Sequence, residues 1–71
     1  MKYFFKYKYL NGGKFRGHNL EEIRINENNI LLIGKDKLEL NDGIYEVPFN
    51  IYIDANEIEY LKIEPMKEVE E

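Results

Sequence analysis

A two-residue alternation of apolar and polar side chains is the feature that most constrains the fold of this 71-residue chain. Near the start, aromatic residues occupy every second position, at Tyr3, Phe5, Tyr7 and Tyr9. Lysines and one further aromatic residue fill the positions between them. Successive side chains of a β-strand point to opposite faces, so this pattern predicts a half-buried strand over residues 2–10.

The same alternation returns in the second half of the chain. Apolar side chains share one face at Tyr45, Val47, Phe49, Ile51 and Ile53. Pro48 falls on the opposite face of this predicted strand. Proline has no N–H to donate to a neighbouring strand, so we expect this strand to lie at a sheet edge or to kink there.

Turn signals divide the chain into short segments. They lie at Asn11-Gly12-Gly13, in the Asn-rich stretch 26–29, at 34–37, at Asn41-Asp42-Gly43 and at 54–57. Turns at intervals of about 8–12 residues are typical of small antiparallel β folds. The sequence therefore predicts an all-β fold, a small antiparallel barrel or roll of about six short strands, with room for one short helix or helical turn.

Two stretches admit a second interpretation. Asn19 followed by Glu22 has the spacing of a helix capping box, although the β-branched Ile23 and Ile25 favour a strand over 19–25. In the last apolar segment the alternation changes parity, which predicts a bulge or a helical turn within 55–62.

Chain length and cysteine content limit how such a fold is stabilised. We expect one compact domain over 1–65, followed by a mobile acidic tail over 66–71. A chain of this length buries only about 60% of the surface that its unfolded form exposes, so its core is marginal, and without cysteine it has no disulfides. Packing of large side chains and self-association are the remaining sources of stability.

Residue types absent from the chain bear on catalysis. It contains no Ser, Thr or Cys, which removes the usual hydroxyl and thiol nucleophiles, and its one histidine, His18, stands alone. We therefore expect no enzyme activity, no cofactor and no metal site. No apolar run approaches the length of about 18 residues that a membrane helix needs, so a cytoplasmic protein without membrane contact is the expectation.

Charge is distributed unevenly along the chain. Residues 1–18 carry five basic and no acidic side chains (+5), whereas 19–71 carry five basic and fourteen acidic ones (−9), which together give −4. The candidate interaction surface comprises Lys2, Lys6, Tyr7, Lys8, Lys14, Arg16 and His18. Within it, the glycine-rich stretch 12–18 resembles an anion cradle only weakly, and a solvated hairpin connection is the interpretation that we favour.

The basic aromatic segment has two interpretations. In the first, the aromatic face belongs to the core and the lysines pair with glutamates on neighbouring strands. In the second, rings and lysines form a platform for single-stranded nucleic acid, although the overall acidity of the chain disfavours it.

A further hypothesis concerns the acidic remainder. The candidate acidic surface comprises Glu39, Glu46, Asp54, Glu57, Glu59 and Glu64. A small acidic protein of the phage or mobile-element type can occupy the basic nucleic-acid groove of a nuclease or defence effector. The interpretation that we favour is a non-catalytic interaction module, which binds a protein partner or a second copy of itself through a sheet edge and its charged surface.

Overall fold

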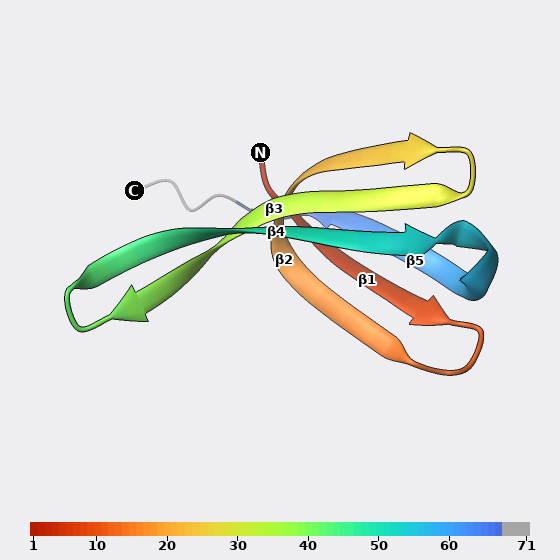
Figure 1. Ribbon diagram of the computed structural model, residues 1–71, viewed down its shortest axis with the longest axis horizontal. Coiled ribbons are helices and arrows are strands. Elements are labelled where there is room, and N and C mark those ends of the chain that lie inside the picture. Colours follow the sequence, from red (N-terminus) through yellow and green to blue (C-terminus); the bar gives the residue numbers. More distant parts are fainter. Residues whose placement is uncertain (68–71) are drawn as a thin grey trace.

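The computed structural model describes residues 1–67 and contains one antiparallel sheet (Figure 1). Its elements are β1 (Tyr3–Tyr9), β2 (Lys14–Asn26), β3 (Asn29–Leu40), β4 (Gly43–Asp54), the 3₁₀ turn η1 (Ala55–Glu57) and β5 (Ile58–Pro65). The strand order is β4-β3-β2-β1-β5. The all-β prediction is therefore confirmed, while most of the predicted acidic tail, residues 68–71, lies outside the described residues.

Two details of the predicted architecture are wrong, namely the barrel alternative and the turn at 34–37. The sheet is not closed into a barrel, and it has five strands, several of them longer than expected. The turn predicted at 34–37 does not exist, because β3 runs through it with residues 35–37 paired to residues 46–48 of β4. Gly34 instead allows a close approach, since a Cβ there would lie 2.3 Å from the carbonyl oxygen of Asn19 and 2.4 Å from Cζ of Phe49.

A bend in β2 divides the sheet into two layers. The first half of β2 pairs with β1, and the second half pairs with β3. At the bend, Asn19 has a positive φ of 63°, and the register with β3 shifts between Leu20 and Glu22. The helix considered over 19–25 is therefore replaced by a bent strand, which folds the β3–β4 layer toward the β1–β5 layer (Figure 1).

The core fills the space between these layers. Its buried members are Phe5, Tyr7, Leu20, Ile30, Leu32 and Ile53. The Tyr7 ring stacks on Phe15 at a centroid distance of 5.3 Å and meets the edge of Tyr9 at 5.6 Å. The predicted aromatic face of the first strand is thus confirmed as a core face, and aromatic rings provide much of the packing that a chain of this size needs.

The open sheet has two edge strands, β4 and β5. Pro48 lies on β4, so its predicted place at a sheet edge is confirmed. The irregularity predicted within 55–62 is also present, as η1 and as a register shift where β5 pairs with Lys8 and Tyr9.

The turn between β2 and β3 stores local strain. The hairpin predicted at 26–29 is present, but its left-handed residue is Glu27, with φ of 56°, and not an asparagine. Asn tolerates this conformation better than Glu, because its short side chain hydrogen-bonds locally. We expect Glu27→Asn to raise the free energy of unfolding by about 0.5–1 kcal/mol in urea denaturation.

The same substitution at Glu21 is the matched control for that prediction. Glu21 is exposed on β2 and is not among the residues with positive φ. Glu21→Asn should therefore bring no gain in stability. Equal effects of the two substitutions would contradict strain at Glu27.

Candidate interaction surfaces

The far half of the β3–β4 hairpin extends from the body as a two-stranded arm. β3 pairs with β2 only as far as Gly34, whereas its pairing with β4 continues to Leu40 and Gly43. Residues 35–48, here called the arm, therefore lie to one side of the two layers (Figure 1, left). With no neighbour among residues 1–67 on the β2 side, residues 35–40 form a free strand edge.

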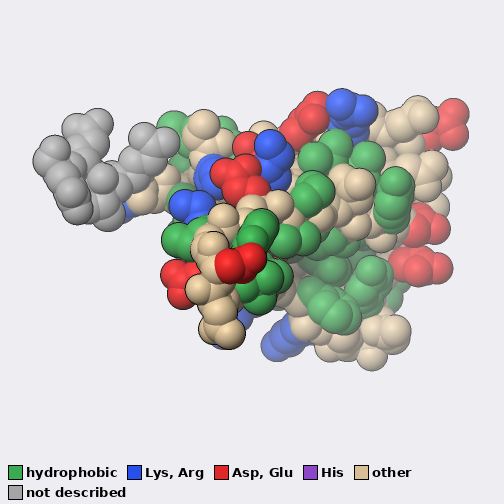
Figure 2. Space-filling model, turned by 60° about the vertical axis from the view of Figure 1, so that its left-hand side comes forward, with side chains coloured by type: hydrophobic (Ala, Val, Ile, Leu, Met, Phe, Trp, Pro, Cys, Tyr) green, Lys and Arg blue, Asp and Glu red, His purple; other side chains and the backbone are tan. Residues whose placement is uncertain are grey.

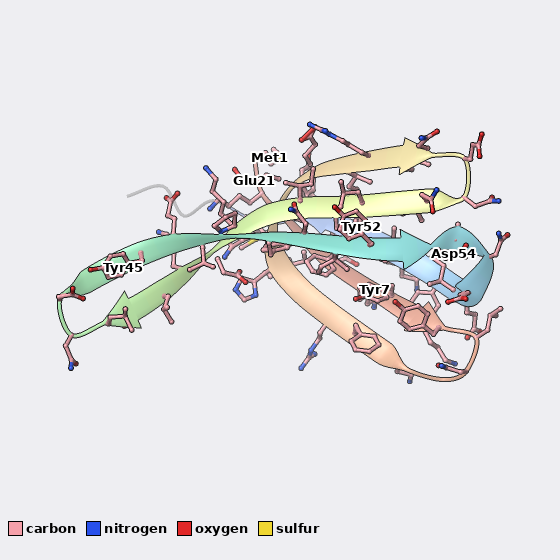
Figure 3. All side chains as sticks on the ribbon, in the orientation of Figure 1. Met1, Tyr7, Glu21, Tyr45, Tyr52 and Asp54 are labelled. Atoms are coloured by element: carbon pink, nitrogen blue, oxygen red, sulfur yellow. The ribbon has the colours of Figure 1, made fainter. Side chains whose placement is uncertain are left out.

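One face of the arm is largely apolar and uncovered, and Asp36, opposite Val47, is its charged member. Leu38, Leu40, Tyr45 and Val47 lie on it, with exposed fractions of 48%, 54%, 44% and 42%. They have the same parity as the core residues Leu32 and Ile53 farther along the two strands. The side of the β3–β4 hairpin that faces the core thus continues onto the arm, where the opposite layer no longer covers it. Tyr45 of the arm accordingly lies far from the core residue Tyr7 (Figure 3).

Hydrogen-bond alternation shows which backbone groups point to the free edge. The Ala55 N–H donates to the Asn28 carbonyl at 2.7 Å, so the pair Asn28–Ala55 is a hydrogen-bonded pair. Hydrogen-bonded pairs recur at every second residue of an antiparallel ladder, so the even-numbered residues of β3 are the ones that bond to β4. Pro48, which has no N–H, accordingly lies opposite the odd-numbered Lys35. The N–H and C=O groups of Lys35, Lys37 and Glu39 therefore point to the free edge.

A hollow lies between this edge and the bend of β2. It has a volume of about 710 Å³ and is lined by His18, Asn19, Asp36, Lys37, Leu38 and Val47. The Asn19 side-chain amide donates to Asp36 at 3.5 Å across the base of the arm. His18, a predicted surface residue, is exposed at the rim of this hollow.

The residues predicted for the interaction surface divide between the outer face and the core. Lys6, Lys8, Lys14 and Arg16 share the outer face of the β2–β1–β5 layer, as their strand pairing shows. Tyr7 points the opposite way and is only 6% exposed, so its assignment to the interaction surface is wrong. The reason is the alternation itself, since Tyr7 has the parity of Phe5 and joins the core.

Strand pairing adds one cation that the sequence analysis missed. Lys62 of β5 lies directly opposite Lys6. Lys2 precedes β1, where its carbonyl accepts a hydrogen bond from the Met66 N–H at 2.9 Å. No residue pattern along β5 distinguishes Lys62, because its neighbours become known only with the register of three strands.

The predicted pairing of lysines with glutamates is present at Lys8. Lys8 Nζ lies 3.0 Å from Glu59 Oε2, and this hydrogen bond raises the pKa of Lys8. Lys6 has Arg16 and Lys62 on its two sides instead of carboxylates. A carboxylate on a neighbouring strand thus neutralises Lys8, whereas Lys6 has no such partner among residues 1–67.

The acidic candidates do not form one surface. Glu39 and Glu46 lie on the arm, Asp54 precedes η1, Glu57 is the last residue of η1, and Glu59 and Glu64 lie on β5. Asp54 Oδ1 accepts a hydrogen bond from the Asn56 N–H at 2.9 Å and so caps η1. Acidic side chains are correspondingly scattered over the face seen in Figure 2, where hydrophobic ones reach the surface between them.

The glycine-rich stretch 12–18 does not form an anion cradle. Gly12 and Gly13 belong to the β1–β2 turn, where Gly12 has φ of 100°. Gly17 lies within β2, opposite Phe5, and a Cβ there would approach Phe5 Cζ to 2.4 Å. These glycines therefore serve the turn and the packing of Phe5, in two different places.

Comparison of the chain with protein-family models, with curated proteins and with solved structures yields no match. Over residues 1–67 no helix has the length and apolarity to cross a membrane. In the same part of the chain, no three His, Asp or Glu side chains cluster so as to hold a metal ion. The arm and the basic outer face of the β2–β1–β5 layer are therefore the candidate interaction surfaces.

Proposed function

We propose that this chain is a non-catalytic interaction module that pairs with a second copy of itself along the free edge of the arm. The observation that carries this proposal is the unpaired edge of residues 35–40 beside an uncovered apolar face. Free strand edges are templates for pairing with another strand, and apolar side chains beside them favour it.

The charge pattern along the edge is self-complementary. The edge reads Lys35-Asp36-Lys37-Leu38-Glu39-Leu40. In an antiparallel pair centred on Leu38, Lys37 of each copy lies opposite Glu39 of the other. Both residues have backbone groups that point to the free edge, so this register also satisfies the hydrogen-bond pattern of an antiparallel ladder.

The side chains and the turn beside the edge also fit this antiparallel pairing of two copies, which has two-fold symmetry. Leu38 of each copy lies opposite Leu38 of the other on the largely apolar face, where Leu40 lies opposite Asp36. Opposite-charge pairs on the other face add about 0.2–1 kcal/mol each. The turn at Asn41-Asp42-Gly43 of each copy is directed toward the hollow beside β2 of the other. The paired surface is smaller than in a standard interface, so we expect a dimer with a dissociation constant in the micromolar range.

Charge reversal tests this register. Lys37→Glu places two glutamates opposite each other, and Glu39→Lys places two lysines opposite each other. Each variant alone is expected to be monomeric in sedimentation equilibrium at concentrations where the unmodified chain dimerises. An equimolar mixture of the two variants should dimerise again, because every opposed pair is then of opposite charge.

Lys35→Glu is the matched control, since it changes the net charge as Lys37→Glu does but lies opposite an asparagine in this register. It should leave the dimer intact. Circular dichroism of every variant verifies that the sheet is retained. A strict monomer at high concentration, or two variants that fail to combine, would contradict the proposal.

A further inference from the structure

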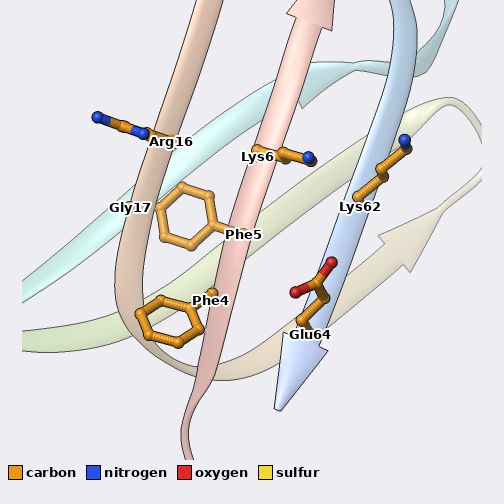
Figure 4. Close-up of a pocket in the computed structure, with 7 residues that line it drawn as sticks. All are labelled: Phe4, Phe5, Lys6, Arg16, Gly17, Lys62 and Glu64. Atoms are coloured by element: carbon orange, nitrogen blue, oxygen red, sulfur yellow. The ribbon is translucent and has the colours of Figure 1, made fainter. Parts of the chain in front are cut away.

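The outer face of the β2–β1–β5 layer gathers cations in rows across three strands. Arg16 and Lys62 lie directly opposite Lys6 on either side (Figure 4). Lys14 lies opposite Lys8 in the next row. Residues opposite each other in a sheet project from the same face. Five cations thus share this face with Glu64, which lies opposite Phe4, and with Glu59, which forms a salt bridge with Lys8. The difference, 5 − 2, is a net charge of +3.

This arrangement is unfavourable for the sheet alone. Like charges directly opposite each other on neighbouring strands are destabilising. Within residues 1–67, Lys8 is the cation of this face that has a salt bridge, whereas Lys6 and Arg16 have none. A bound anion would relieve the repulsion along the row of Arg16, Lys6 and Lys62.

Aromatic rings accompany the cations. Phe4 is 48% exposed on the same face, one row from Lys6, and the Lys62 ammonium lies 5.1 Å from the centroid of the Tyr60 ring. Two shallow hollows of about 190 and 290 Å³ adjoin there, and both are lined by Lys6 and Arg16. Phe4 lines the first hollow and Tyr60 the second.

The dimensions of the strip indicate an extended ligand. Neighbouring strands are about 4.8 Å apart and alternate residues about 6.6 Å apart, so the rows form a strip and not a single pocket. A single phosphate would contact one row, whereas a chain of phosphates would contact several. Exposed rings among the cations favour a ligand that also has flat bases.

We propose that this outer face binds single-stranded nucleic acid. Phosphates lie along Arg16, Lys6, Lys62 and Lys14, and bases stack on Phe4 and Tyr60. A flexible single strand can remain on the strip, whereas a rigid duplex would extend over the acidic parts of the chain. This face uses other strands than the arm, so the proposal does not depend on the dimer.

Fluorescence anisotropy with a labelled oligothymidylate of about 12 nucleotides tests the proposal. With three or four phosphates contacted, the logarithm of the association constant should fall with the logarithm of salt with a slope of about −2 to −3. Lys6→Gln and Arg16→Gln should each reduce the slope by about 0.7. Phe4→Leu should weaken binding about fivefold or more, because it removes a stacking ring.

Lys35→Gln on the arm is the matched control, with the same charge change away from this face, and it should bind as the unmodified chain does. Lys6, Arg16 and Phe4 are exposed, so circular dichroism should show folded variants. No anisotropy change at about 50 mM salt would overturn the proposal. Equal affinity for duplex DNA or for phosphatidylserine vesicles would also overturn it, since any polyanion would then suffice.

Discussion

Gly34→Ala is expected to lower the free energy of unfolding by about 2–3 kcal/mol, at the upper end of the usual cost of overpacking. The added Cβ would lie 2.3 Å from the Asn19 carbonyl oxygen and 2.4 Å from the Phe49 ring. The ring can turn, but the carbonyl belongs to the backbone at the bend of β2. Thermal denaturation should show a midpoint lower by about 10–20 °C for a domain of this size.

Gly13→Ala is the control for this prediction. Its Cβ would meet the nearest atoms at 3.4 Å, an ordinary contact, and its φ is not among the positive values. Alanine there should leave stability unchanged or raise it slightly, because it restricts the unfolded chain. If Gly34→Ala and Gly13→Ala had equal midpoints, close approach at the base of the arm would be ruled out.

Gly34 also illustrates a limit of the sequence. A glycine followed by Lys-Asp-Lys has the composition of a turn, and nothing local distinguishes that role from a close approach between strands. The distinction depends on Asn19 and Phe49, which are distant in the chain. Because Gly34 was assigned to a turn at 34–37, the predicted strand ended too early and the arm was not predicted. The wrong turn thus affected the candidate site as well as the fold.

Period-two alternation, by contrast, predicted which side of each strand faces the core. It was correct for Phe5 and Tyr7, which are buried, and for Ile53 at the end of β4. Alternation does not show how far the opposing layer extends. Tyr45 and Val47 have the same parity as Ile53, yet they are exposed because no other strand within residues 1–67 lies over the arm.

The basic face was predictable in part. Lys6 and Lys8 follow from the parity of the first strand, and a tight turn brings Lys14 and Arg16 beside them. Lys62 becomes part of the face only through the pairing of β1 with β5, which are far apart in the chain. Registers of this kind are set by the whole sheet, so the row of three cations could not be predicted from local patterns.

Tyr7→Ala is expected to remove about 3–5 kcal/mol from the free energy of unfolding, which is the usual cost of truncating a buried aromatic residue. The ring contacts Phe5, Tyr9 and Phe15, so its loss leaves a cavity in the aromatic core. The whole free energy of unfolding of a 71-residue chain is about 4–11 kcal/mol. A substantial unfolded population should therefore appear in urea titrations that begin near zero denaturant.

Lys6→Gln, one residue away, separates this core role from a role in binding. Lys6 is exposed on the opposite face of β1, so its substitution should change stability by less than about 0.5 kcal/mol. Loss of oligonucleotide binding in Tyr7→Ala would then follow from unfolding, and loss in Lys6→Gln from the missing charge. Equal stability of the two variants would contradict the burial of Tyr7.

The hydroxyl of Tyr7 gives the same experiment a dependence on pH. Burial, together with the neighbouring Tyr9, raises the pKa of Tyr7 above its ordinary value of 10.0. The neutral hydroxyl is therefore favoured in the folded chain, and its contribution to stability is complete below pH 10 and is lost as pH rises through the folded-state pKa.

Tyr7→Phe keeps the ring and removes this ionisation, so its free energy of unfolding should fall less between pH 9 and 11 than that of the unmodified chain. Tyr45 and Lys8, whose pKa values are also raised, titrate in both proteins, and their contributions cancel in the comparison. Parallel pH profiles for the two proteins would show that the Tyr7 hydroxyl is in contact with solvent.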